Sequence, residues 1–83
     1  MKLTKEAFEI LSNIEEGMND LNQIYTSTNL EKDKIKEIFL KLEKLNLITI
    51  TKKYDSYYKE DYWNAKTTKE GLEVFNEYLK SKK

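Results

Sequence analysis

The sequence predicts a single α+β domain, mainly helical, made of three helices, a two-stranded hairpin and a closing helix. Apolar residues recur at three- and four-residue intervals up to about residue 45, which is the spacing of amphipathic helices. The next run, Leu-Ile-Thr-Ile-Thr at 47–51, alternates with period two and is rich in β-branched residues, as strands are. Few small helical proteins change to a strand pattern directly after a third helix, so this order is informative.

The first helix is predicted from about residue 5 to 16, between a cap at Thr4 and a left-handed end at Gly17. The second helix is short, with Asn19 as its cap, and a polar turn at 26–29 leads to the third helix at 31–45. The side chains expected to face the core are Leu3, Ala7, Ile10, Leu11, Ile14, Leu21, Ile24, Tyr25, Ile35, Ile38, Phe39, Leu42 and Leu45.

The hairpin is predicted to have strands at 47–51 and 61–66, joined by an exposed tip at 52–60. Trp63 is expected to pack beneath it, because a Trp side chain has a large area to bury. Thr67 and Glu70 have the spacing of a capping box, which predicts a last helix ending near residue 80. The expected inner face of this helix is Leu72, Phe75 and Leu79.

The composition restricts the classes of function. The 83 residues have room for one core, so one domain is expected over 1–83, and 15 basic residues balance 15 acidic ones. The absence of Arg, His, Cys and Pro removes the commonest general base, a thiolate nucleophile and the usual zinc ligands. Adjacent acids at 15–16 and 60–61 have no partner base, so we expect no enzyme activity, no cofactor and no metal. No apolar run approaches the roughly 20 residues that span a bilayer, so we expect a cytoplasmic protein without membrane contact.

Residues 24–48 resemble the helix-turn-helix of winged-helix transcription regulators. Leu42-Glu43-Lys44-Leu45-Asn46-Leu47-Ile48 is similar to the family pattern Leu-Glu-x-x-Gly-Leu-Ile that follows the recognition helix. Thr67-Thr68-Lys69-Glu70-Gly71 is similar to the pattern Leu-Thr-x-x-Gly that begins the helix after the wing. The resemblance covers the whole chain and implies a recognition helix at about 31–45 and a β-hairpin wing at about 47–66.

Four positions depart from the family. Asn29 and Asn46 stand where the family often has Gly; Asn is the next-best residue for a left-handed conformation, so we expect both to adopt it. Glu31 and Glu37 place acids on the helix surface that should approach DNA.

The resemblance implies a transcriptional regulator that binds double-stranded DNA, with its third helix in the major groove and its wing along the backbone. With no Arg, sequence preference should be modest or favour A·T pairs, read through Thr28, Lys36, Tyr57 and groove shape. The residues expected at DNA are Thr28, Lys32, Lys34, Lys36, Lys52, Lys53, Tyr57 and Lys59.

Less specific interpretations stay open. The lysines of 31–45 alternate with four acids and suit a solvated helix surface equally well. Tyr54, Tyr57 and Tyr58 either follow a phosphate backbone or cover the faces of the strands. Zero net charge, with Glu31 and Glu37, supports an alternative function, a winged-helix protein–protein interaction module without sequence-specific DNA binding.

Some apolar residues lie off the predicted inner faces. Phe8 does so on the first helix, and Val74 with Tyr78 forms a second stripe on the last helix. Winged-helix regulators commonly dimerise through such helices, so the resemblance implies a homodimer with Phe8, Val74 and Tyr78 at its interface and a two-fold DNA site.

Overall fold

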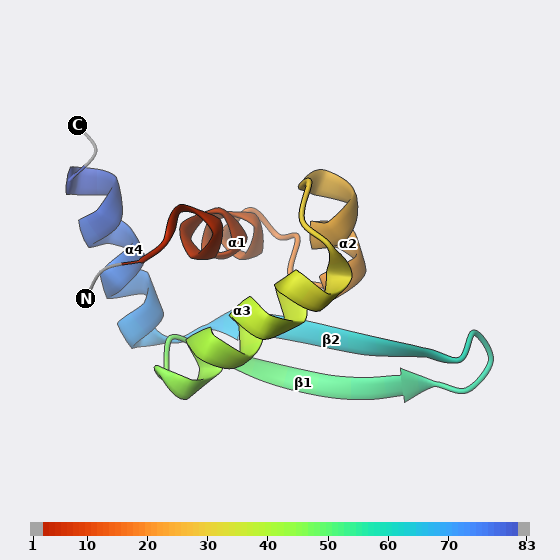
Figure 1. Ribbon diagram of the computed structural model, residues 1–83. Helices are drawn as coiled ribbons and strands as arrows, with labels where there is room; N and C mark the ends of the chain where they lie inside the picture. The colour runs from red at the N-terminus through yellow and green to blue at the C-terminus, as the bar shows by residue number, and fades with distance from the viewer. Residues whose placement is uncertain (1–2, 82–83) are drawn as a thin grey trace.

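The computed structural model describes residues 3–81 and confirms the order of elements (Figure 1). Helix boundaries differ from the predicted ones by one or two residues, whereas the two strands are longer than predicted. The elements are α1 (Lys5–Glu15), α2 (Leu21–Ser27), α3 (Lys32–Lys44), β1 (Ile48–Asp55), β2 (Glu60–Thr67) and α4 (Lys69–Ser81).

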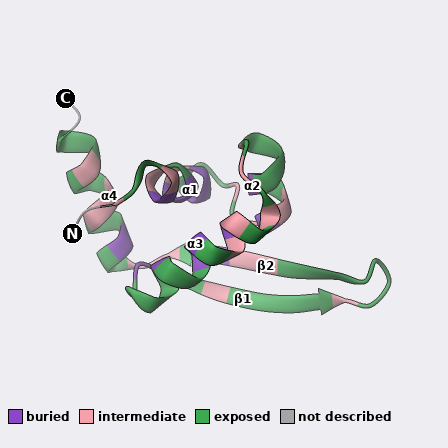
Figure 2. Cartoon of the chain, viewed as in Figure 1, coloured by how far each residue is buried: buried purple, intermediate pink, exposed green. Residues whose placement is uncertain are grey.

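The core lies between α1, α2, α3 and the base of the hairpin. Figure 2 shows buried segments on these helices, while the outer half of the hairpin is exposed. Burial of this apolar surface is the main stabilising contribution to the fold. The buried apolar residues are Ala7, Ile10, Leu11, Ile14, Leu21, Ile24, Ile35, Ile38, Phe39, Leu42, Leu47, Ile48 and Ala65.

Four residues predicted to face the core are exposed, so those predictions are wrong: Tyr25, Leu45, Leu72 and Leu79. Leu45 follows the last residue of α3, where the chain leaves the helix, and Tyr25 lies on the outer surface of α2. The two leucines of α4 are exposed because this helix turns a different face towards α1.

The inward face of α4 is formed by Val74, Phe75 and Tyr78. Val74 and Phe75 pack against the core, and the Phe8 ring lies 5.1 Å from that of Phe75 and 4.2 Å from that of Tyr78 between centroids. Tilted rings at these separations attract each other beyond the area that they bury. The interpretation of Val74 and Tyr78 as a second, outward stripe is therefore wrong, because these side chains and Phe8 pack within the chain.

Several predicted caps and turns are present. The Thr4 hydroxyl accepts a hydrogen bond from the Ala7 amide at 3.1 Å, and Gly17 has a φ of 97°. Asn46 is left-handed as expected, with a φ of 63°. Asn29 does not adopt the left-handed conformation. In the described part of the chain, the non-glycine residues with a positive φ are Asn46 and Lys59.

Two predicted caps are displaced by one residue. The cap of α2 is Asp20 instead of Asn19, and it makes no side-chain capping bond. The cap of α4 is Thr68, whose hydroxyl accepts from the Gly71 amide at 3.0 Å and donates to the Asn46 carbonyl at 2.7 Å. Thr67 is instead the last residue of β2, because the strand continues further than its apolar pattern indicates.

The start of α4 is tied tightly to the corner between α3 and β1. The Thr68 amide donates to the Leu47 carbonyl at 3.0 Å. A Cβ atom at Gly71 would collide with that same carbonyl oxygen, so this position requires glycine. The corner fixes the direction in which the hairpin leaves the core.

The hairpin is a long antiparallel ribbon paired from Ile48↔Thr67 to Asp55↔Glu60. The predicted tip at 52–60 is therefore too long, and the turn occupies 56–59. The outer pairs extend beyond the core, where no buried face imposes alternating apolar residues, so the pattern there does not indicate a strand. The Asp55 carboxylate accepts from the amides of Tyr57 and Tyr58 at 2.8 and 3.2 Å, which orders the turn.

Candidate nucleic-acid interface

Helix α3 is amphipathic, and its buried side fixes where its lysines lie. Ile35, Ile38, Phe39 and Leu42 face the core, so lysines at other helical positions fall on two opposite flanks. We call Lys32 and Lys36 the wing flank, because both border the hairpin side of the helix. We call Lys34 and Lys41 the α1 flank, because both border α1.

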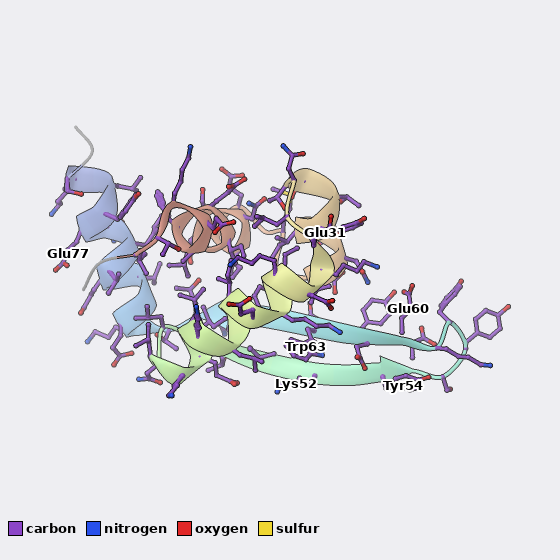
Figure 3. All side chains as sticks on the ribbon, in the orientation of Figure 1. Glu31, Lys52, Tyr54, Glu60, Trp63 and Glu77 are labelled. Carbon is purple, nitrogen blue, oxygen red and sulfur yellow. The ribbon has the colours of Figure 1, made fainter. Side chains whose placement is uncertain are left out.

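The wing flank contacts the hairpin directly. The Lys36 Nζ atom lies 3.5 Å from Asp61 Oδ2 and 5.4 Å from the centre of the Trp63 ring. The Lys52 Nζ atom lies 4.8 Å from the same ring, and Figure 3 shows Lys52 and Trp63 on the hairpin beneath α3. Both distances are within the range of cation–π attraction. Trp63 thus packs against the core, as predicted, and also holds two ammonium groups at the surface.

A groove of about 240 Å³ runs between the α2–α3 unit and the wing. Three lysines, Lys32, Lys36 and Lys59, line it together with two acids, Glu60 and Asp61, so its charge is positive by one. The remaining lining residues are Leu21 and Asn22. Residues far apart in the sequence therefore place three ammonium groups around one open groove.

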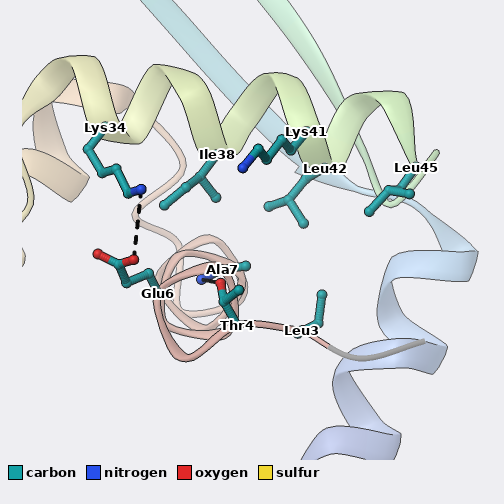
Figure 4. Close-up of a pocket in the computed structure, with 9 residues that line it drawn as sticks. All are labelled: Leu3, Thr4, Glu6, Ala7, Lys34, Ile38, Lys41, Leu42 and Leu45. Atoms are coloured by element: carbon teal, nitrogen blue, oxygen red, sulfur yellow. Dashed lines mark hydrogen bonds and ion pairs between the residues drawn. The ribbon is translucent and has the colours of Figure 1, made fainter.

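The α1 flank is neutralised by acids. The Lys34 Nζ atom lies 4.0 Å from a carboxylate oxygen of Glu6 and 4.0 Å from one of Glu37, and Lys41 Nζ lies 3.5 Å from Glu37. Figure 4 shows Lys34 directed at Glu6, beside a small, mainly apolar pocket between α1 and α3. The charge of Lys34 thus points towards α1 and away from the groove, and its contact with DNA stays a prediction.

Thr28 belongs to the turn of the helix-turn-helix. Its hydroxyl donates to the Ile24 carbonyl at 2.8 Å and accepts from the Leu30 amide at 3.3 Å. A hydroxyl has one donor, and phosphate needs a donor, so DNA contact would cost Thr28 its bond to Ile24. Thr28 is therefore held in the turn, and its contact with DNA stays a prediction.

The wing presents side chains on both faces, as a two-stranded ribbon must. Lys52 pairs in register with Trp63 on the face towards α3, whereas Lys53 pairs with Tyr62 on the other face. At the tip Tyr57 is 84% exposed, and its ring meets that of Tyr58 edge-on at 4.9 Å. The tip tyrosines therefore do not cover strand faces and are free to meet a partner.

Sequence reasoning missed the part played by Asp61. It is the acid closest to Lys36 and lies 25 residues away in the chain. No local spacing connects the two residues; only the register of the hairpin and the direction in which it leaves the core bring them together.

No group of three or more acidic side chains among residues 3–81 could hold a metal ion. No helix in the same range is long and apolar enough to cross a membrane.

The comparisons with known proteins agree with this architecture. No protein-family model matches the sequence, and a search of curated proteins gives no match. Among solved structures, BpsR of Bordetella bronchiseptica, whose DNA binding is regulated by 6-hydroxynicotinic acid, superposes with a TM-score of 0.74 at 18% identity over 94% of this chain and 58% of that chain. A MarR protein from Peptoclostridium difficile gives 0.72 at 26% identity over 96% of this chain and 51% of that one.

The PcaV transcriptional regulator of Streptomyces coelicolor, solved with its natural ligand, gives a TM-score of 0.67 at 21% identity over 89% of this chain and 51% of that chain. These neighbours are winged-helix transcription regulators, and the present chain spans about half of their length. The winged helix-turn-helix fold expected from the sequence is therefore confirmed.

Proposed function

We propose that the protein is a DNA-binding transcriptional regulator. The observation that carries the proposal is the convergence of Lys32 and Lys36 from the recognition helix with Lys59 from the wing on one groove. Ammonium groups on two adjacent elements suit a phosphate backbone, whose charges follow a regular path. The regulatory functions of the structural neighbours support the same assignment.

In this proposal α3 enters the major groove and the wing follows the neighbouring backbone. Lys32, Lys36, Lys52, Lys53 and Lys59 supply phosphate contacts, and Tyr57 packs against the backbone from the tip of the wing. Lys34 and Thr28 take no part. Because lysine is a point charge without the planar fork of arginine, the phosphate contacts give affinity and little selectivity.

We further propose that the protein acts as a homodimer. Leu72 and Leu79 form an exposed apolar stripe on α4, on a different face of the helix from Val74 and Tyr78, which are partly buried within the chain. A second copy covering this stripe would remove it from water and place two recognition helices about a two-fold axis. Sizing at high concentration tests this: the wild type should elute as a dimer and the variant Leu72→Ser/Leu79→Ser as a monomer. A wild-type monomer would refute the dimer.

The function is tested by fluorescence anisotropy with a labelled AT-rich duplex at two salt concentrations. We expect binding that weakens steeply as salt rises, because bound lysines release counterions from DNA. Binding that is micromolar or weaker and independent of salt would contradict the proposal and favour the protein-interaction module.

Charge reversal locates the surface. Lys36→Glu with Lys59→Glu should abolish binding, while the matched control Lys5→Glu with Lys69→Glu changes the net charge equally on helices away from the groove and should retain it. A circular-dichroism melt establishes that both variants fold. Unchanged affinity in the first variant would mean that the interface lies elsewhere.

A further inference from the structure

The ridge of α3 opposite the buried face is not basic. Its residues follow helical spacing at 33, 37, 40 and 44, and all four are exposed or half-exposed at the surface: Asp33, Glu37, Leu40 and Lys44. In the docking proposed above, this ridge points deepest into the major groove and the flanking lysines meet the phosphates. Residues of the ridge are therefore the ones within reach of base edges.

Glu37 is held in the middle of this ridge by two ion pairs. Its two carboxylate oxygens lie 4.0 Å from Lys34 and 3.5 Å from Lys41, and the side chain is 51% exposed. The ammonium groups offset its negative charge, which lowers the cost of bringing a carboxylate up to a polyanion. Lys34 and Lys41 of the α1 flank thus compensate the charge of Glu37.

A carboxylate accepts hydrogen bonds and donates none. In the major groove the amino groups of cytosine and adenine are both donors, but adenine places the acceptor N7 beside its amino group and guanine presents two acceptors, so cytosine is the base that suits a carboxylate. Leu40, 43% exposed and one turn further along the ridge, offers an apolar contact of the kind that matches the methyl group of thymine.

From this arrangement we propose that Glu37 is a specificity-determining residue that selects a cytosine in the major groove, with Leu40 favouring a thymine beside it. The inference rests on the proposed DNA-binding function and deepens it. An acid that was expected only to repel DNA is thereby given a role in base recognition. It also adds one C·G position, beside the thymine met by Leu40, to a site whose remaining positions are read by groove shape.

The test is selection of duplexes from a random pool by the full chain, followed by competition binding on the selected sequences. The wild type should enrich one cytosine per recognition helix and discriminate against the other bases by roughly tenfold, the range of a single good side-chain contact. Glu37→Gln should move the preference at that position from cytosine to adenine, because a side-chain amide pairs with the adjacent donor and acceptor of adenine. The control Glu9→Gln removes the same charge from an exposed position of α1 and should keep the wild-type motif.

The outcomes distinguish the role of Glu37 from the DNA-binding function on which it rests. Identical motifs for the wild type and Glu37→Gln would overturn the role of Glu37 and leave DNA binding intact. Failure of the wild type to retain any duplex at low salt would overturn the DNA-binding function and the role of Glu37 together. Leu40→Ala should lose the preference for thymine and keep the preference for cytosine. Loss of the cytosine preference alone would contradict the assignment of cytosine to Glu37 and of thymine to Leu40.

Discussion

The wing flank and the α1 flank of α3 each carry two lysines, but the surroundings of the two pairs differ. On the wing flank the ammonium groups lie over the aromatic rings of Tyr25 and Trp63, and Asp61 is the single acid paired with them in the described part of the chain. On the α1 flank two lysines share the carboxylates of Glu6 and Glu37. A ring attracts a cation without cancelling its charge, whereas a carboxylate cancels it. The partner of each lysine, and not the count of lysines, therefore decides which flank suits phosphate.

Removing the wing flank should have the largest effect. Lys32→Ala with Lys36→Ala is expected to weaken binding to a mixed-sequence duplex by roughly 50-fold at about 0.1 M salt, because two phosphates are no longer neutralised. Lys34→Ala with Lys41→Ala, measured by the same anisotropy titration, should weaken it by no more than about fivefold, through long-range charge and the lost compensation of Glu37. Equal losses of affinity in the two variants would remove the distinction between the flanks.

The tip of the wing should contribute less. Tyr57→Ala with Lys59→Ala is expected to weaken duplex binding by about tenfold, since it removes one phosphate-binding ammonium group and one exposed aromatic surface. The melting temperature should stay unchanged, because neither side chain packs on the core. Lys69→Ala at the start of α4 is the matched single-charge control. Full affinity in the tip variant would show that the wing does not reach DNA.

A smaller effect of opposite sign is expected at Asp61. Asp61→Asn removes the carboxylate beside Lys36 and leaves the ammonium group to phosphate, so duplex affinity should rise about threefold. Competition binding at low salt measures this, with Glu9→Gln as the control for net charge. Weaker binding in Asp61→Asn would instead mean that the acid positions Lys36 for DNA.

The smallest effect concerns stability. Lys34→Ala should lower the free energy of unfolding by only about 0.5 kcal/mol, since its ion pairs are long and partly exposed to water. Urea denaturation monitored by circular dichroism gives this value. A decrease above about 1.5 kcal/mol would exceed what exposed pairs contribute and would show that the α1 flank is held by more than charge.

The helical part of the fold could be predicted because local patterns specify it. The apolar spacing of α1 and α3 and the left-handed Asn46 all read correctly from the sequence. The face of α4 could not be read, because the helix has two apolar stripes, one with Leu72, Phe75 and Leu79 and one with Val74 and Tyr78. The choice between them depends on Phe8, which contacts α4 only in the folded chain.

The candidate site was harder to predict for the same reason. The lysines of α3 were recognisable, but their division into two flanks depends on Glu6 from α1 and Asp61 from β2, which no local spacing connects to them. The outer wing was read as a long tip because its residues have no buried face to alternate with. Tertiary partners thus decide what the charge pattern alone leaves open.

The salt dependence of duplex binding in the two flank variants tests the central claim most directly. The slope of log affinity against log salt should become shallower by about 1.8 in Lys32→Ala/Lys36→Ala, about 0.9 for each phosphate that these lysines neutralise in the wild type. In Lys34→Ala/Lys41→Ala it should equal that of the wild type. A wild-type slope in the first variant, or a reduced slope in the second, would contradict the assignment of the wing flank as the surface that binds DNA.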